Sequence, residues 1–198
     1  MKRILFFGDS ITKAGALKGG YIDLIRQAVY NKNKQKDFEL TSAGIDGNKV
    51  YDLYLRMDAD VLNKNPAIVV VYIGINDIWH KTSGTGTDIE KYEIFYRAII
   101  KKLQEKNINL ILCTASVIGE KQKANAQDAD LEAYSAIIRK LAVEYNCLLV
   151  DLRAAFMNYE IQHNTGNKEL GILTTDGVHL NDRGNQLVAE EMLKVLSL

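Results

Sequence analysis

Residues 67–77 read AIVVVYIGIND, and this stretch indicates the class of fold to which the chain belongs. Its first seven residues are apolar or aromatic and lack the alternation of a half-exposed strand, which predicts a β-strand buried on both faces. Strands of that kind are typical of parallel sheets covered by helices on both sides. A glycine and the polar pair Asn76 and Asp77 come close behind, at the carboxyl end of the predicted strand.

Similar apolar runs recur along the chain and alternate with segments of helical spacing. The predicted strands are residues 3–7, 38–42, 67–73, 109–114 and 147–150. The predicted helices are residues 21–30, 50–62, 89–106, 131–145 and 186–196. Parallel neighbours need crossover connections, and right-handed crossovers place helices against the sheet. We therefore expect an α/β fold, a flavodoxin-like three-layer α/β/α sandwich with a five-stranded parallel sheet.

Length and composition narrow the class of protein. The 198 residues contain no internal repeat or linker, so we expect residues 1–198 to form a single domain. Lys plus Arg and Asp plus Glu both number 25, and the resulting net charge of zero argues against a nucleic-acid partner. The apolar stretch at residues 4–7 is too short for a signal peptide or membrane span, so we expect a cytoplasmic protein without membrane association. Cys113 and Cys147 lack metal or redox spacing and are expected to be core side chains.

Chemistry in a parallel α/β sheet gathers at the carboxyl ends of its strands. After the first predicted strand come Gly8, Asp9 and Ser10, where a sharp turn would present the serine at the start of a helix. A serine there lies at the positive end of the helix dipole, and its backbone N–H is free to donate to an oxyanion. Taken alone, the same residues also fit simple helix capping.

Two further segments at this edge could donate hydrogen bonds. Residues 44–48, GIDGN, form a glycine-rich loop before a predicted helix and would offer unpaired backbone N–H groups to an anion. Asn76 follows the third predicted strand, and its amide could donate to developing negative charge. Each of these signals is also explained by ordinary turns and caps.

Near the C-terminus, Asp176 stands three residues before His179. One turn can hold both side chains together. A carboxylate bonded to one ring nitrogen sets the tautomer of the imidazole and leaves the other nitrogen to accept a proton from a serine. Four separate segments therefore each offer a residue type for one role in acyl transfer, which independent helix capping does not predict.

Two other functions stay open from the residues alone. Asp9, Asp77, Asp176 and His179 could converge on a divalent cation, as in a metal-dependent phosphoesterase. The strand-end loops could instead hold a nucleotide or flavin in a non-catalytic flavodoxin-like binding module, although residues 8–15, GDSITKAG, match a phosphate-binding loop poorly.

The order of these motifs resembles that of the SGNH/GDSL hydrolases. GDS lies near the N-terminus, a glycine lies in the second loop, GxND follows the third strand and DxxH lies near the C-terminus, so the resemblance spans almost the whole chain. It implies a serine esterase that needs no metal or organic cofactor. By the resemblance, Ser10 is the nucleophile, and His179 with Asp176 is the general base and its orienting partner. The oxyanion hole would comprise the Ser10 N–H, Gly47 and Asn76.

Some details of the resemblance remain unassigned. Ser42 stands where the family often has asparagine, five residues before the oxyanion glycine, so Gly44 is a rival to Gly47 as donor. A substrate pocket is expected from the residues around the nucleophile and the third motif: Asp9, Ile75, Ile78 and Trp79. Ile75, Ile78 and Trp79 fit packing beneath the loop equally well. The polar connection at residues 115–130 is a candidate rim or lid.

The resemblance bounds the reaction more closely than the substrate. We expect hydrolysis of small carboxylic esters with short acyl groups, such as acetyl esters of sugars or other metabolites, through an acyl-enzyme. An acyl thioesterase or lysophospholipase would use the same site.

Overall fold

In the computed structural model, the described residues 1–122 and 125–196 include one five-stranded parallel sheet in the order β2-β1-β3-β4-β5. The strands are β1 (Lys2–Gly8), β2 (Phe38–Gly44), β3 (Ile68–Tyr72), β4 (Asn109–Cys113) and β5 (Leu148–Val150). This is the strand order of the flavodoxin-like fold. The predicted fold class is confirmed, and each predicted strand has an observed counterpart whose bounds differ by no more than two residues.

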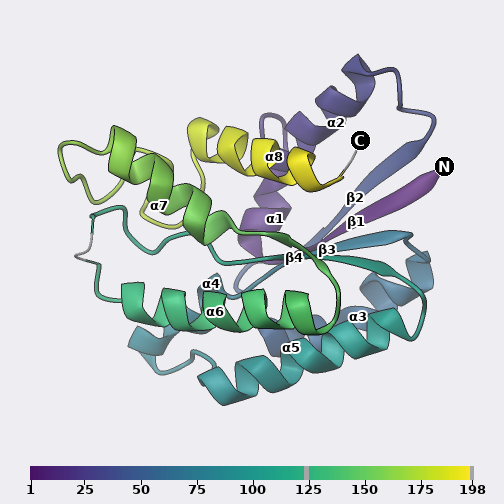
Figure 1. Cartoon of the computed structure of the whole chain (residues 1–198), viewed down its shortest axis with the longest axis horizontal. Helices are drawn as coiled ribbons and strands as arrows, with labels where there is room; N and C mark the ends of the chain where they lie inside the picture. Colours follow the sequence, from purple (N-terminus) through teal and green to yellow (C-terminus); the bar gives the residue numbers. More distant parts are fainter. Residues whose placement is uncertain (123–124, 197–198) are drawn as a thin grey trace.

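Helices cover both faces of the sheet (Figure 1). One face carries α1 (Ser10–Gly15), α2 (Tyr21–Asn31), α7 (Leu152–His163) and α8 (Asp182–Leu196). The other carries α3 (Val50–Asp60), α4 (Ile75–Trp79), α5 (Ile89–Gln104) and α6 (Asp128–Glu144). Two short 3₁₀ turns, Leu62–Lys64 and His80–Ser83, follow α3 and α4. Since the central strands are covered on both sides, their residues are almost all apolar.

The strand register brings the motif-bearing strand ends into line. Gly8 at the end of β1 pairs with Gly44 on one side and with Tyr72 on the other. Tyr72 in turn pairs with Cys113, the last residue of β4. The segments that follow β1, β2 and β3 therefore leave the sheet side by side at one edge, where the predicted site residues lie.

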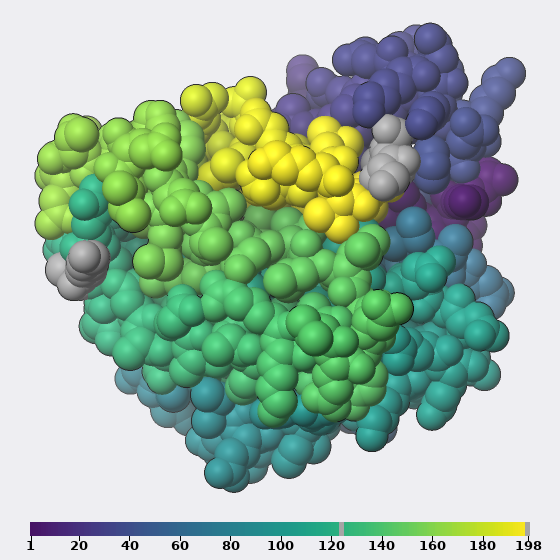
Figure 2. Space-filling view, viewed as in Figure 1, coloured from purple at the N-terminus to yellow at the C-terminus, as the bar shows by residue number. Residues whose placement is uncertain are grey.

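Helix α7 was not predicted. Its buried residues include the charged Arg153 and Glu160, whereas the apolar Met157 and Ile161 are exposed, so residues 152–163 lack a clean apolar stripe. In the space-filling view α7 (light green) lies beside α8 (yellow), and the two helices contact each other (Figure 2). The sequence pattern also placed the starts of α6 and α8 too late, because their first turns are polar and lack apolar residues that mark a helix.

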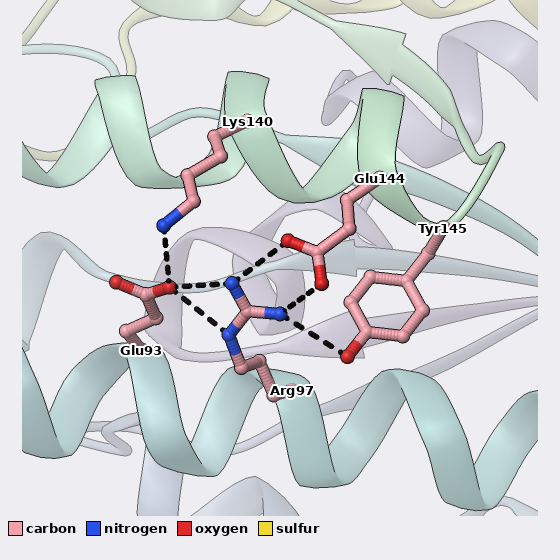
Figure 3. A network of polar contacts seen from close by, with 5 residues as sticks. All are labelled: Glu93, Arg97, Lys140, Glu144 and Tyr145. Atoms are coloured by element: carbon pink, nitrogen blue, oxygen red, sulfur yellow. Dashed lines mark hydrogen bonds and ion pairs between the residues drawn. The ribbon is translucent and has the colours of Figure 1, made fainter.

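A charged network joins α5 to α6 (Figure 3). Arg97 pairs with Glu93 and with Glu144 and also donates to the Tyr145 hydroxyl, while Lys140 Nζ lies 3.0 Å from Glu93 Oε1. Hydrogen bonds from Arg97 lower the pKa of both Glu93 and Glu144. The network is partly exposed, so we expect it to contribute modestly to stability and not to chemistry.

The two cysteines differ in burial. Cys113 is buried in β4, as expected of a core side chain, whereas Cys147 is only partly buried just ahead of β5. Within the described ranges, none of the helices combines the length and apolar character that a membrane span requires.

Candidate active site

The turn after β1 presents Ser10 at the start of α1. Gly8 is required there, because a Cβ atom would lie 2.3 Å from both Thr12 Oγ1 and the Tyr72 carbonyl oxygen. Asp9 caps the helix: its Oδ1 accepts a hydrogen bond of 3.0 Å from the Ile11 N–H. Ser10 is the first helical residue and is half-buried, and its backbone N–H donates to no other described residue.

Three side chains from opposite ends of the chain form a line of hydrogen bonds. Ser10 Oγ lies 3.1 Å from His179 Nε2, and His179 Nδ1 lies 2.7 Å from Asp176 Oδ2. The other oxygen of Asp176 accepts the backbone N–H groups of Val178 at 3.0 Å and His179 at 2.8 Å. Gly177 adopts a φ of +92° in this turn, a conformation that favours glycine. This line of hydrogen bonds has the geometry that a nucleophile, a base and an orienting carboxylate require.

The surroundings of the pair favour a charged Asp176. Partial burial by itself would raise the pKa of this carboxyl, but hydrogen bonds from the His179 ring and from the backbone of Val178 and His179 lower it below its usual value. Asp176 is therefore ionised at neutral pH. The ring of Trp79 meets the imidazole of His179 edge to face, with the ring centroids 6.1 Å apart.

Glu120, which sequence patterns did not single out, supports the loop that carries Asp176 and His179. Its side chain is completely buried, and its carboxylate accepts the backbone N–H groups of Ile172, Leu173 and Thr174 and the hydroxyl of Thr174, over distances of 2.5–2.8 Å. Thr174 Oγ1 also accepts the Gly177 N–H at 3.0 Å. The buried carboxylate thereby anchors the turn through backbone donors, a role that leaves no motif in the sequence.

The connection at residues 115–130 contains Glu120 and is tied to the same loop. The Gly119 N–H donates to the Gly177 carbonyl over 2.8 Å, and the Glu120 N–H donates to the Glu169 carbonyl over 2.8 Å. The first part of this connection is therefore a fixed support of the Asp176–His179 loop. Residues 123 and 124 lie outside the described residues.

Asn76 lies in the first turn of α4, at the end of β3. It is 3% exposed, and its Nδ2 donates to the Asn48 carbonyl at 3.1 Å. An amide nitrogen carries two protons, so the second N–H has no acceptor among the described residues. Gly74 sets the entry to this helix with a φ of +132°, and a Cβ atom there would lie 2.7 Å from the Tyr92 hydroxyl.

The two candidate glycines in the second loop differ in their surroundings. Gly47 is exposed with a φ of +73°, and its N–H donates to no other described residue. Gly44 ends β2 and packs against α1, where a Cβ atom would lie 2.2 Å from the Lys13 nitrogen. Gly47 therefore has a free backbone donor beside Asn48, the residue that Asn76 contacts.

The four side chains considered for a cation site are engaged elsewhere. Asp9 caps α1, Asp77 accepts the Val50 N–H at 3.2 Å, and Asp176 bonds His179. Burial raises the pKa of Asp9 to about 7 and that of Asp77 to about 6. Among the described residues, no three His, Cys, Asp or Glu side chains are grouped so that they could hold a metal ion. This geometry gives the phosphoesterase interpretation no support.

The predicted pocket residues lie in different environments. Ile75 and Ile78 are 1% and 0% exposed and pack in the core beneath the loop, and Asp9 is 2% exposed, so none of the three offers substantial surface to a substrate in this structure. Trp79 is half-buried and lines a cavity of about 370 Å³ that also contacts Asp176, Gly177 and Val178. Of the four predicted pocket residues, Trp79 is thus the one beside an open cavity.

Several known proteins resemble this chain in sequence and in fold. The model of the GDSL-like lipase/acylhydrolase family matches residues 6–187. An acetylxylan esterase from Geobacillus stearothermophilus is 30% identical over 217 residues, which cover 98% of this chain and 93% of that protein. A solved structure of an acetyl xylan esterase has a TM-score of 0.96 and 55% identity, and the match covers 97% of this chain and 98% of the other. A catalytic serine-to-alanine mutant of the Geobacillus enzyme has a TM-score of 0.86 and 25% identity, with 98% and 93% covered.

Proposed function

Since the chain belongs to the GDSL-like lipase/acylhydrolase family and is a carboxylic ester hydrolase, we propose that it removes acetyl groups from acetylated xylan or its oligosaccharides. The observation that carries the proposal is the line of hydrogen bonds from Ser10 through His179 to Asp176 at the carboxyl edge of the sheet. Two relatives that match nearly the full chain are acetylxylan esterases, which supports the acetylated sugar as substrate.

In the proposed reaction Ser10 Oγ attacks the acetyl carbonyl carbon while its proton passes to His179 Nε2. Asp176 accepts a hydrogen bond from the Nδ1–H of His179. The bond keeps this proton on Nδ1 and stabilises the imidazolium that forms. When the tetrahedral intermediate collapses, the bond to the sugar oxygen breaks and His179 returns its proton to that oxygen. Water, deprotonated by the same imidazole, then releases acetate from the acetyl-enzyme and restores Ser10.

Three donors are proposed to hold the negative charge on the tetrahedral intermediate: the backbone N–H groups of Ser10 and Gly47 and the side-chain N–H of Asn76. Both backbone groups lack acceptors among the described residues, and Asn76 has a second N–H beyond the one given to Asn48. Gly47 is preferred to Gly44 because Gly44 is packed against α1. Donors held in place before the reaction stabilise a developing charge without the cost of reorganising solvent.

Asn76→Ala is expected to lower kcat by about 10²–10³-fold with little change in KM, because one preorganised donor is lost and the nucleophile stays. Steady-state hydrolysis of p-nitrophenyl acetate measures this change. Thermal unfolding of the variant checks that loss of the bond to Asn48 has not destabilised the fold. An unchanged kcat in a folded variant would remove Asn76 from the proposed oxyanion hole.

The cavity beside Trp79 is proposed to receive the sugar. The cavity is lined by Trp79 and Asp176, and both of these residues contact His179. Aromatic faces are suited to the apolar faces of pyranose rings, and polar groups around the rim can bond sugar hydroxyls. Lys121, Asn125 and Gln127 are polar residues in the lining of this cavity.

The proposed substrate can be tested by measuring acetate release from acetylated xylo-oligosaccharides together with a series of acetyl, butyryl, octanoyl and palmitoyl p-nitrophenyl esters. We expect kcat/KM to be highest for acetyl and to fall steadily with chain length. A chelator should leave the rates unchanged. Preference for long acyl chains, for a lysophospholipid or for an acyl thioester would support the alternative acylhydrolase functions of the same serine.

A further inference from the structure

Arg56 of α3 contacts several groups at the carboxyl edge of the sheet. Its side chain is 15% exposed, and its guanidinium lies over the Phe7 ring, 4.5 Å from the ring centroid. Nη2 donates to the carbonyl oxygens of Gly8 at 2.8 Å and Ala43 at 2.9 Å. Nε donates to Asn48 Oδ1 at 2.7 Å. One planar group therefore links the ends of β1 and β2 to the loop that follows β2.

Two of these three acceptors lie close in sequence to a proposed oxyanion donor. Gly8 lies two residues before Ser10, and Asn48 directly follows Gly47. Asn48 also accepts the side-chain N–H of Asn76 with its carbonyl oxygen. Arg56 thus bonds the side chain of Asn48, while the side chain of Asn76 bonds the backbone carbonyl of Asn48. Hydrogen bonds of Arg56 and Asn48 therefore connect the segments that carry the three proposed donor groups.

The charge of Arg56 is matched locally. Nη1 pairs with Asp60 Oδ2 at 2.6 Å, one turn further along α3. A guanidinium neutralised in this way adds little net field at the site, whereas its fork of N–H groups fixes the relative positions of its acceptors. A geometric role is therefore favoured over a direct electrostatic one.

We infer that Arg56 is a positioning residue of the oxyanion hole, which aligns the Gly47 and Asn76 donors with the Ser10 N–H. The inference rests on the proposed function for the assignment of those donors. Donors that shift by a fraction of an ångström still bind the neutral ester but no longer match the oxyanion, so the effect belongs to the transition state.

The test compares Arg56→Ala and Arg56→Lys with the native enzyme on p-nitrophenyl acetate. We expect kcat to fall by about 10–100-fold in Arg56→Ala with KM little changed, as for a small misplacement of catalytic groups. Arg56→Lys keeps the charge but loses the fork and should be impaired as well. Added guanidinium should restore part of the activity of Arg56→Ala, which a general loss of stability would not allow.

A double-mutant cycle with Asn76→Ala separates positioning from support of the fold. If Arg56 acts through the oxyanion hole, its replacement should cost much less kcat once Asn76 is gone. Arg97→Ala is the matched control, because it removes an arginine with several polar partners between α5 and α6 (Figure 3) and should leave kcat unchanged. If Arg56→Ala does not fold, Arg56→Lys carries the same cycle.

The outcomes distinguish the inference from the proposed function. Activity that survives in Ser10→Ala would overturn the proposed serine mechanism whatever Arg56 does. If Ser10→Ala is inactive but the Arg56 variants keep the native kcat, or lose the same factor with and without Asn76, the positioning role alone is refuted.

Discussion

Ser10→Ala is expected to reduce kcat for acetyl esters by on the order of 10⁶-fold, about as much as removal of the whole triad. The hydroxyl that would form the acetyl-enzyme is then absent. His179 keeps its bond to Asp176, and the Gly47 and Asn76 donors remain, so a small residual rate above the spontaneous reaction should persist. Initial rates with p-nitrophenyl acetate, corrected for spontaneous hydrolysis, measure the loss. Mass spectrometry is expected to detect the acetyl-enzyme in the native protein during turnover and not in the variant.

Ser135→Ala provides the matched control for that substitution. Ser135 is 1% exposed in α6, and its hydroxyl has no hydrogen-bond partner among the described residues, so replacement with alanine should preserve both the fold and kcat. Ser10 itself is half-buried, and among the described residues its side chain hydrogen-bonds to His179 alone, so Ser10→Ala should also fold normally. Substantial activity in a folded Ser10→Ala protein would overturn the proposed nucleophile.

Asp176→Asn is expected to reduce kcat by roughly 10⁴-fold with KM little changed. The reason lies in the two backbone donors that face Oδ1. The N–H groups of Val178 and His179 require an oxygen at that position, so the amide nitrogen of an asparagine would point at His179 Nδ1. Nδ1 would then have to accept, and the ring proton would move to Nε2, where it prevents the histidine from taking the proton of Ser10.

The expected tautomer change makes this prediction specific. Nitrogen NMR of the imidazole should report the proton on Nε2 in the variant and on Nδ1 in the native enzyme at a pH where the ring is neutral. Asp182→Asn, at the exposed start of α8, is the matched control and should retain native kcat. A fall of less than about tenfold in Asp176→Asn would show that His179 does not depend on this carboxylate.

Whether the sequence reveals a residue of the proposed site depends on which groups that residue contacts. Ser10, Asn76, Asp176 and His179 are proposed to act through their side chains. They lie close behind a predicted strand or share a single turn, so local pattern was sufficient to propose them. Arg56 and Glu120 could not be found in this way. Both act by bonding backbone groups of distant segments, and any residue can supply a backbone carbonyl or N–H.

The predicted pocket residues differ in burial, which their sequence pattern does not show. Ile75, Ile78 and Trp79 lie in one short helix, and their residue types fit either packing or ligand contact. The two isoleucines face the core, while Trp79 borders the cavity. Helix α7 illustrates the related difficulty for secondary structure, because its buried Arg153 and Glu160 break the apolar stripe that reveals a helix.

The sequence by itself determined the α/β class and the strands of the parallel sheet, at whose carboxyl ends the site is built. These depend on the spacing of apolar residues and on the handedness of crossovers, which act locally and apply to every chain of this kind. Only the tertiary structure decided that Ser10 meets His179, that Gly47 has a free amide while Gly44 is packed, and that Arg56 and Glu120 hold the loops. Those outcomes depend on which distant groups come together in the folded chain, and sequence spacing does not encode such distances.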